Sequence, residues 1–334
     1  MEDRHRDLCS DCAHGSEFEH LPGFYQCNCV VSPVSAPSHC TFYAGPRTPV
    51  DVVIMTAVSV ESDAVLAELH PNGRAAWKPI CTVQNGLWYV STYESPNNPR
   101  ARVRLALPEL PRSSGLPAAA SLTALAVQLF RPSHVAMLGI TAGRQGEVGI
   151  GDIIVPRELW DYGAGKWEEN RRTRRVVFRP RAVPKIIKDH VRQWCHQLGN
   201  RREYLSRMHE DWATRHPNVD FPVPRVHIGP MVSGAAVVNT ERIWQQVLKQ
   251  NDKVIALDME AYGVVYATEL AAVPLYSPQC VVIKSVCDYG VDKTDWAQEY
   301  AAYTSVKFFK IYLEEFILNE EYRRNPARMN VLSG

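Results

Sequence analysis

The chain has 334 residues, 46% of them apolar, and a formal net charge of +1. This length and composition suffice for one large buried core with a small accessory module. The near-neutral charge argues against nucleic acid as the principal partner and gives no electrostatic attraction to a membrane surface. No apolar run approaches the length of a membrane span, and the N-terminus lacks the apolar stretch of a signal peptide, so we expect a cytoplasmic location.

The first 45 residues form a separate, cysteine-rich segment. Five of the nine cysteines lie there, among Gly, Pro and Ser residues with no helical periodicity. A segment this short and polar cannot fold on hydrophobic burial alone, so we predict a small module held together by a structural Zn²⁺. The predicted ligands are Cys9, Cys12, Cys27 and Cys40. Cys29 could replace Cys27, and weaker candidate ligands are His14, His20 and His39. The alternative is that the segment is a disordered tail that binds no metal.

Pro46–Pro49 marks the predicted boundary to a main domain over residues 50–320, with 321–334 as a C-terminal tail. Asp51–Met55 is the predicted first strand, and the helix after it carries Glu61 in its first turn. The helix dipole alone favours an acid at this position, so a purely structural role is the alternative to a catalytic one.

Four further elements lead up to and include the strand before a glycine-containing loop. Strands are predicted over 87–93, 101–107 and 134–140, and a helix over 116–130. The last strand runs into Thr141, Ala142, Gly143 and Arg144. Small residues at such a loop let the backbone approach a flat base or a ribose closely.

The segment from about 163 to 225 departs from the pattern of a compact domain, because seven residues between 166 and 181 are Lys or Arg. Such a charge run is usually a solvent-exposed face. The alternative is that some of these arginines bind phosphate groups, for which a bidentate guanidinium is well suited. A helical stretch over 184–198 and an Arg- and Pro-containing connection follow, up to residue 225.

The stretch from Val254 to Gly290 predicts a strand, a helix and a second strand. Both apolar runs end in acidic residues, Glu260 after the first and Asp288 after the second. In an open parallel sheet the carboxyl ends of strands lie at one edge, where ligands bind, so we expect the two carboxylates to share a cleft. The alternative is that each only caps the helix or turn that follows it. A long amphipathic helix over 296–318 closes the domain.

Three segments resemble, in this order, the signature segments of the purine nucleoside phosphorylase and uridine phosphorylase superfamily, in its methylthioadenosine/S-adenosylhomocysteine nucleosidase branch. They are GITAGRQGEVGIGDIIVP from Gly139, Asp258–Ala261 and Ser285–Asp288. The resemblance covers about residues 52–318. It implies a three-layer α/β fold in which a central mixed, mostly parallel sheet is flanked by helices.

The resemblance also implies roles for single residues. Asp288 would donate a proton to the purine N7, Glu260 would accept hydrogen bonds from the ribose hydroxyls, and Glu61 would orient the attacking water. Asp63 is the alternative to Glu61. The remaining substrate contacts fall on Met259, Thr141, Ala142, Gly143, Val237, Val238 and Arg144. The resemblance calls for no cofactor in catalysis and implies a homo-oligomer, either a dimer or a hexamer.

The predicted reaction is hydrolysis of the N-ribosidic bond of an adenine nucleoside or nucleotide. The ending KSVCDYGVDKTDWAQEYAAYTS resembles the phosphorylase-like domains of defence proteins, members of which strip adenine from ATP, and the arginine-rich segment suits a phosphorylated substrate. Methylthioadenosine or S-adenosylhomocysteine is the alternative substrate and would need an apolar pocket. Two further hypotheses are phosphorolysis, for which Arg144 keeps an anion site open, and a nucleotide-sensing module without activity.

Overall fold

The computed structural model describes residues 50–319 except 82–85, 97, 110–113, 170, 275 and 293, together with three short strands among the first 49 residues. The chain divides into two units, residues 1–49 with 79–88 and the remainder. In the first unit β1 (Gly15–Glu17) pairs antiparallel with β2 (Tyr25–Cys27), which pairs with β3 (Pro33–Val34). Cys9, Cys12 and Cys40 lie outside the described residues and only the backbone of Cys27 is described, so the zinc site stays a prediction.

The main sheet is mixed and has ten strands, in the order β12-β9-β13-β14-β8-β4-β7-β6-β5, with β15 pairing with both β8 and β9. The strands are β4 (Val52–Met55), β5 (Lys78–Cys81), β6 (Leu87–Ser95), β7 (Asn98–Pro108), β8 (His134–Gly143), β9 (Ile153–Asp161), β12 (Lys185–Ile186), β13 (Val226–Ser233), β14 (Ala256–Asp258) and β15 (Gln279–Asp288). Five of them close a ring, because β8 pairs with β15, β15 with β9, β9 with β13, β13 with β14 and β14 again with β8.

The ring corrects the predicted relation between the two acid-bearing strands. β15 runs parallel to β8, whereas β14 runs antiparallel to it, so the two strands do not form the predicted parallel crossover unit. They nevertheless reach the same place, since Leu257 of β14 and Asp288 of β15 both pair with Ala142 of β8. The acids at the ends of both strands therefore lie close to one residue of β8, on opposite sides of it.

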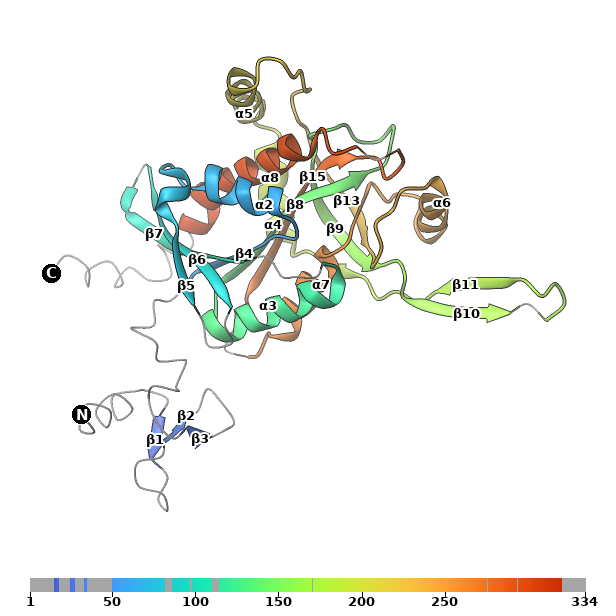
Figure 1. The fold of residues 1–334 in the computed structure, drawn as a ribbon, viewed down its shortest axis with the longest axis horizontal. Coiled ribbons are helices and arrows are strands. Elements are labelled where there is room, and N and C mark those ends of the chain that lie inside the picture. Colours follow the sequence, from blue (N-terminus) through green and yellow to red (C-terminus); the bar gives the residue numbers. More distant parts are fainter. Residues whose placement is uncertain are drawn as a thin grey trace. The chain divides into compact units, whose positions relative to one another are not determined.

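Helices cover both faces of the main sheet (Figure 1). On one side α3 (Leu116–Phe130) packs against α7 (Ala261–Leu270), and on the other α8 (Gln298–Tyr312) packs against α2 (Ser59–Ala64) and the strands β8 and β15. Helix α8 is buried along most of its length. No helix in the described part of the chain is long and apolar enough to cross a membrane.

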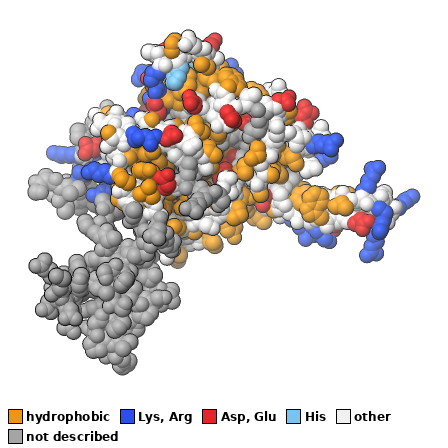
Figure 2. Space-filling model, in the orientation of Figure 1, with side chains coloured by type: hydrophobic (Ala, Val, Ile, Leu, Met, Phe, Trp, Pro, Cys, Tyr) orange, Lys and Arg blue, Asp and Glu red, His pale blue; other side chains and the backbone are white. Residues whose placement is uncertain are grey.

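The arginine-rich segment is more regular than its sequence predicts. The strands β10 (Gly165–Glu169) and β11 (Val176–Pro180) form a hairpin that extends away from the main sheet (Figure 1), with basic side chains towards its end (Figure 2). The helix predicted over 184–198 begins later, as α4 (Asp189–Gly199), because Lys185 and Ile186 form β12. The predicted irregular connection contains a second helix, α5 (Arg202–Arg215), and α6 (Glu241–Gln250) follows β13.

Helices α3 and α7 lie close together at Gly263, where a Cβ atom would lie 2.5 Å from the carbonyl oxygen of Leu116. We expect Gly263→Ala to lower the free energy of unfolding by about 2 kcal/mol in urea denaturation, because the added methyl group must push two backbones apart. Leu270→Ala, at a 73% exposed position of the same helix, is the control and should change stability by less than about 0.5 kcal/mol. Equal losses in both variants would contradict this account of the packing.

Candidate active site

A lysine and three carboxylates are buried together where α2, β14 and β15 meet. Lys284 Nζ lies 3.5 Å from Glu61 Oε1 and 3.5 Å from Asp258 Oδ2. The charge of Glu260 acts on the same lysine, and none of the four residues is more than 7% exposed. Burial of charged groups is tolerated only where they are paired and hydrogen-bonded, so these contacts are a condition for the fold as well as for any chemistry.

Glu61 is held by backbone groups on two sides. Its Oε2 accepts hydrogen bonds from Ala57 N at 2.5 Å and Val58 N at 3.1 Å, which satisfies donors at the start of its own helix. Its Oε1 accepts a hydrogen bond from Ile140 N of β8 at 2.7 Å. Gly139 makes this approach possible, since a Cβ there would lie 1.8 Å from Oε1. Glu61 therefore has the structural role that the helix dipole predicts and also reaches the centre of the buried cluster.

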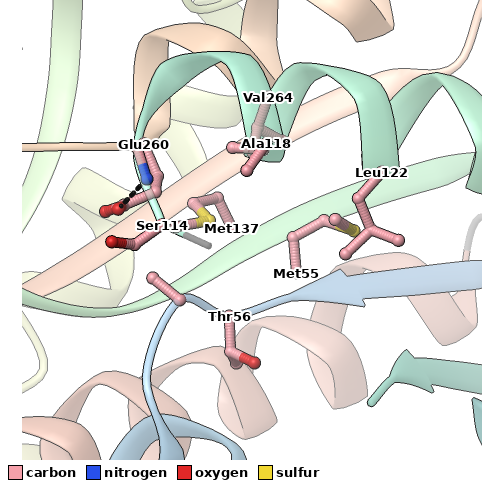
Figure 3. A pocket seen from close by; sticks show the side chains of 11 residues that line it. Met55, Thr56, Ser114, Ala118, Leu122, Met137, Glu260 and Val264 are labelled. Atoms are coloured by element: carbon pink, nitrogen blue, oxygen red, sulfur yellow. Dashed lines mark hydrogen bonds between the residues drawn. The ribbon is translucent and has the colours of Figure 1, made fainter. Parts of the chain in front are cut away.

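Asp258, and not Glu260, caps helix α7. Asp258 Oδ2 accepts a hydrogen bond from Ala261 N at 3.0 Å, and its Oδ1 accepts one from Ser233 Oγ at 2.6 Å. Glu260 turns to the other side, where its Oε1 accepts a hydrogen bond from Gly115 N at 2.8 Å, just before α3 (Figure 3). Asp258 therefore has the capping role that was the structural alternative for Glu260.

Burial sets the protonation of the cluster. It raises the pKa of Glu260 to about 7, with the Lys284 ammonium acting against the shift and the Asp258 carboxylate adding to it. Burial also raises the pKa of Asp258, again against the effect of Lys284. For Lys284 burial disfavours the charged form, but the three carboxylates outweigh it and its pKa is raised. The lysine consequently stays charged, while Glu260 exchanges its proton near neutral pH.

A small cavity opens beside Glu260 (Figure 3). It is lined by Met55, Thr56, Ala57, Ser114, Gly115, Ala118, Ala119, Leu122, Met137, Glu260 and Val264. Most of these side chains are apolar, and Glu260 is the one charged group among these described lining residues. One carboxylate and two hydroxyl groups in an apolar wall suit a mainly uncharged ligand that donates hydrogen bonds at one end.

Asp288 lies on the other side of β8 from β14 and holds a turn. Its Oδ1 accepts a hydrogen bond from Gly290 N at 2.7 Å, and Cys287 Sγ donates to its Oδ2 at 3.2 Å. Gly290 packs next to Ala142 and Val238, whose side chains would both lie 3.6 Å from a Cβ at this position. The turn-capping alternative for Asp288 therefore applies, and Asp288 is not among the residues that line the cavity beside Glu260.

The predicted glycine-containing loop joins these two regions. Thr141 Oγ1 donates a hydrogen bond to Leu257 O at 2.8 Å and thereby ties β8 to β14. At Gly143 a Cβ would lie 2.5 Å from Val148 Cγ2 and 2.7 Å from Val286 Cγ1. The small residue at 143 is thus required by internal packing, which is a different reason from the ligand approach that the sequence suggested.

Other predicted contact residues lie further from the cavity. Val237 is 65% exposed, whereas Val238 is buried with Ala142 in one apolar cluster. The Arg144 guanidinium donates a hydrogen bond to Asp252 O at 2.7 Å, and Met259 is half-buried between the two acids of its segment. Asp63, the alternative to Glu61, lies on the exposed side of α2 and pairs with Arg74 at 2.5 Å.

Sequence reasoning assigned no role to Lys284 or Asp258. A signal for the lysine was present, because it interrupts the apolar run Val281–Ile283 of a strand that is buried along its whole length. A charged group inside such a run is too costly to bury without a partner of opposite sign. That rule predicts nearby acids, although it does not say which acids they are.

The described chain thus has a mixed sheet that includes a closed ring of five strands, with buried acids at strand ends. The family model of the phosphorylase superfamily matches residues 77–318. The chain belongs to this superfamily.

Solved structures of nucleosidases have the same fold. The 5′-methylthioadenosine/S-adenosylhomocysteine nucleosidase of Neisseria meningitidis aligns with a TM-score of 0.56 at 18% identity, over 79% of this chain and 98% of that one. The futalosine hydrolase of Helicobacter pylori aligns with a TM-score of 0.57 at 17% identity, over 81% of this chain and 100% of that one. At these identities the likeness concerns the fold.

Two curated relatives are similar in sequence. The uncharacterized protein y4jS of Sinorhizobium fredii is 31% identical over 259 residues, which are 77% of this chain and 60% of the relative. The ATP nucleosidase Cap17 of Escherichia coli (strain KTE188) is 25% identical over 195 residues, which are 55% of this chain and 36% of the relative. The chain thus spans less than two thirds of the length of these curated relatives.

Removal of the Lys284 ammonium should destabilise the fold, because the buried acids around it are then uncompensated. We expect Lys284→Met to lower the free energy of unfolding by about 3–5 kcal/mol at about pH 8, because Glu61 and Asp258 lose their cation. Burial already raises the pKa of Asp258, so the defect should shrink as the pH is lowered and this acid takes up a proton. Lys307→Met, which breaks a surface pair with Asp211, is the control and should cost less than about 1 kcal/mol. A pH-independent defect in chemical denaturation would contradict the electrostatic account.

The raised pKa of Glu260 predicts a pH-dependent stability. The folded state holds this proton more tightly than the unfolded chain, whose ordinary value is 4.5, so the associated stability is complete below that value and is lost as pH rises through about 7. The loss amounts to about 3 kcal/mol at most. Thermal melts should therefore show Glu260→Gln to be more stable than the native protein at about pH 8 and equal to it at about pH 4. Glu94→Gln, at an exposed position, should follow the native protein at both pH values.

Proposed function

We propose that the protein hydrolyses the N-ribosidic bond of an adenine nucleoside or nucleotide and releases adenine. The observation that carries this proposal is the buried cluster of Glu61, Asp258 and Glu260 around Lys284, which opens through Glu260 into a cavity. Cleavage of this bond requires carboxylates that bind the sugar and a group that helps water attack. The nucleosidase fold of the solved relatives supports this choice of reaction.

In the proposed reaction Glu260 accepts hydrogen bonds from the ribose hydroxyls, with Met259 against the sugar. Glu61 orients a water molecule and takes its proton as the water oxygen bonds to the anomeric carbon. The bond to the purine breaks, its electron pair goes to the base, and Asp288 donates a proton to N7. The Lys284 ammonium lies 3.5 Å from Glu61 Oε1 and balances the charge of this carboxylate.

Hydrolysis is proposed over phosphorolysis because a phosphorylase needs a cationic anion site. The guanidinium at the glycine-containing loop, that of Arg144, is directed to the carbonyl oxygen of Asp252. The described residues that line the cavity include no arginine or lysine. Because this lining offers no cation that could hold a phosphate ion, water is the proposed nucleophile.

Two substrates remain as candidates for this site. ATP is proposed first, with a role as a defence effector, because of the similarity to the ATP nucleosidase Cap17. Methylthioadenosine or S-adenosylhomocysteine is the second candidate, and the apolar lining of the cavity favours it, since a neutral thioether fits such a wall better than a triphosphate. A nucleotide-binding module without activity is the alternative outside enzymes.

An adenine-release assay tests the proposal. The purified protein is incubated with ATP, adenosine, methylthioadenosine or S-adenosylhomocysteine, with and without phosphate, and the products are separated by chromatography. We expect each cleaved substrate to give free adenine and its free sugar even when no phosphate is added to the assay. Asp288→Asn and Glu61→Gln should each lower the rate by about 10²- to 10⁴-fold, because each removes one proton-transfer group.

Asp292→Asn, at an exposed position four residues beyond Asp288, is the matched control and should leave the rate unchanged. Absence of adenine from every substrate would end the enzyme proposal, and retained binding of ATP would then favour the sensing module. Full activity of Asp288→Asn would move the role of acid to another residue.

A further inference from the structure

The hairpin β10–β11 extends from the main sheet and leaves large apolar side chains in solvent (Figure 1). Its strands pair only with each other among the described strands. The register places Trp167 opposite Phe178 and Glu169 opposite Val176, so these four side chains share one face. The rings of Trp167 and Phe178 are 5.0 Å apart, yet Trp167 is 66% exposed and Val176 is 64% exposed. Exposed apolar surface on such a marginally stable element indicates a contact with another molecule.

The positive charge of the chain is concentrated in the same hairpin. Residues 165–181 hold seven basic and two acidic residues, a formal net charge of +5. The whole chain carries +1, which leaves −4 for all other residues together. A near-neutral total argues against a polyanionic partner only where the charge is evenly spread, and here a polyanion would be attracted to the hairpin alone.

Arginines lie around the exposed ring of Trp167. The turn of the hairpin contributes four exposed ones, Arg171, Arg172, Arg174 and Arg175. Arg174 Nε lies 3.2 Å from Glu169 Oε1, which draws this guanidinium to the face that carries Trp167. The side chain of Arg174 is still 79% exposed, so the ion pair leaves it accessible. One surface of the hairpin thus presents a flat indole ring together with guanidinium groups.

We propose that the hairpin binds a single-stranded nucleic acid. Bases stack on the ring of Trp167, and the arginines of the turn bind phosphate groups of the same strand. Only an unpaired base can offer its flat face to a side chain, so the exposed ring favours a single strand over a duplex. Stacking tolerates any base and phosphate contacts carry no sequence information, so this binding has little sequence preference.

Two other anionic partners explain less of the hairpin. The phosphates of a nucleotide substrate would use the arginines, but no residue of the hairpin belongs to the described lining of the cavity beside Glu260. An anionic membrane would meet the tip first, where residues 170–175 are Asn, Arg, Arg, Thr, Arg and Arg. The apolar side chains lie behind this tip, so a membrane contact leaves the exposed ring of Trp167 without a role.

The test is the binding of the full chain to fluorescein-labelled DNA and RNA strands of mixed sequence, measured by fluorescence anisotropy. The strands have about 20 nucleotides, which exceeds the usual site size of about 4–16. We expect both strands to bind, and the matching duplex to bind more weakly. Trp167→Ala should raise the dissociation constant about 5- to 150-fold, the effect of one lost stacking contact, whereas Trp167→Phe should retain most of the binding.

The matched control for the ring is Trp296→Ala. Trp296 is 60% exposed and lies outside the hairpin, so this variant should bind like the native protein. A strand that does not bind even at low salt, or a dissociation constant that Trp167→Ala leaves unchanged, overturns the proposal.

Salt dependence tests the phosphate contacts separately from the ring. Each phosphate contact on a single strand contributes about 0.7 to the slope of log Kd against log salt. Arg171→Ala/Arg175→Ala should therefore lower this slope by about 1.4, whereas Trp167→Ala should leave it unchanged. Arg202→Ala/Arg207→Ala, at exposed positions of α5, is the matched control and should keep the native slope. An unchanged slope in the variant of the turn contradicts the phosphate contacts.

Two competition experiments separate the other partners. ATP added at constant ionic strength should not displace the strand, because displacement would assign the arginines to substrate phosphates. Vesicles of phosphatidylserine and phosphatidylcholine should bind less tightly than the strand. Displacement by ATP, or binding to vesicles without binding to the strand, overturns the proposal. The inference is independent of the proposed reaction, since its readout is strand binding and not adenine release.

Discussion

One ammonium group holds the centre of this protein together. Lys284 projects from β15 into the buried interior and meets Glu61 and Asp258 at 3.5 Å each. These acids come from the helix after β4 and from the end of β14, so the lysine connects β15 with two other elements of the chain. Removal of the charge would leave the carboxylates without compensation in an apolar interior. The closed ring and the protonation of the site therefore depend on the same residue.

The local elements could be predicted from the sequence, because their signals are local. The helix Leu116–Phe130 begins at a Gly-Leu-Pro sequence, and the helix Ala261–Leu270 has the bounds that periodicity and chain breakers indicate. The hairpin β10–β11 and helix α5 were missed, because their sequences are dominated by charge. Charge patterns report exposure to solvent, but they do not distinguish a loop from a regular element that extends into solvent.

The site could be predicted only in part, for a related reason. The sequence indicated Glu61, Glu260 and Asp288 as functional acids, and two of these lie in the buried cluster around Lys284. It could not indicate that Asp258, two residues before Glu260, takes over the capping bond and thereby lets Glu260 turn to the cavity. Which of two neighbouring acids serves a helix end is decided by side-chain directions in the folded chain, and periodicity contains no information on them.

The ring of five strands contains two short contacts, β14 with β8 and β15 with β9, each of two residue pairs. Strand β14 meets β8 through only two residue pairs, Ala256 with Gly143 and Leu257 with Ala142, whereas β15 follows β8 along nearly its whole length. Local opening in proteins begins where few backbone hydrogen bonds must break. Few backbone hydrogen bonds would have to break for β14 to part from β8, and the acid-bearing ends of β14 and β15 lie beside this contact. A fluctuation that parts these two pairs would connect the two halves of the site without disturbing the rest of the sheet.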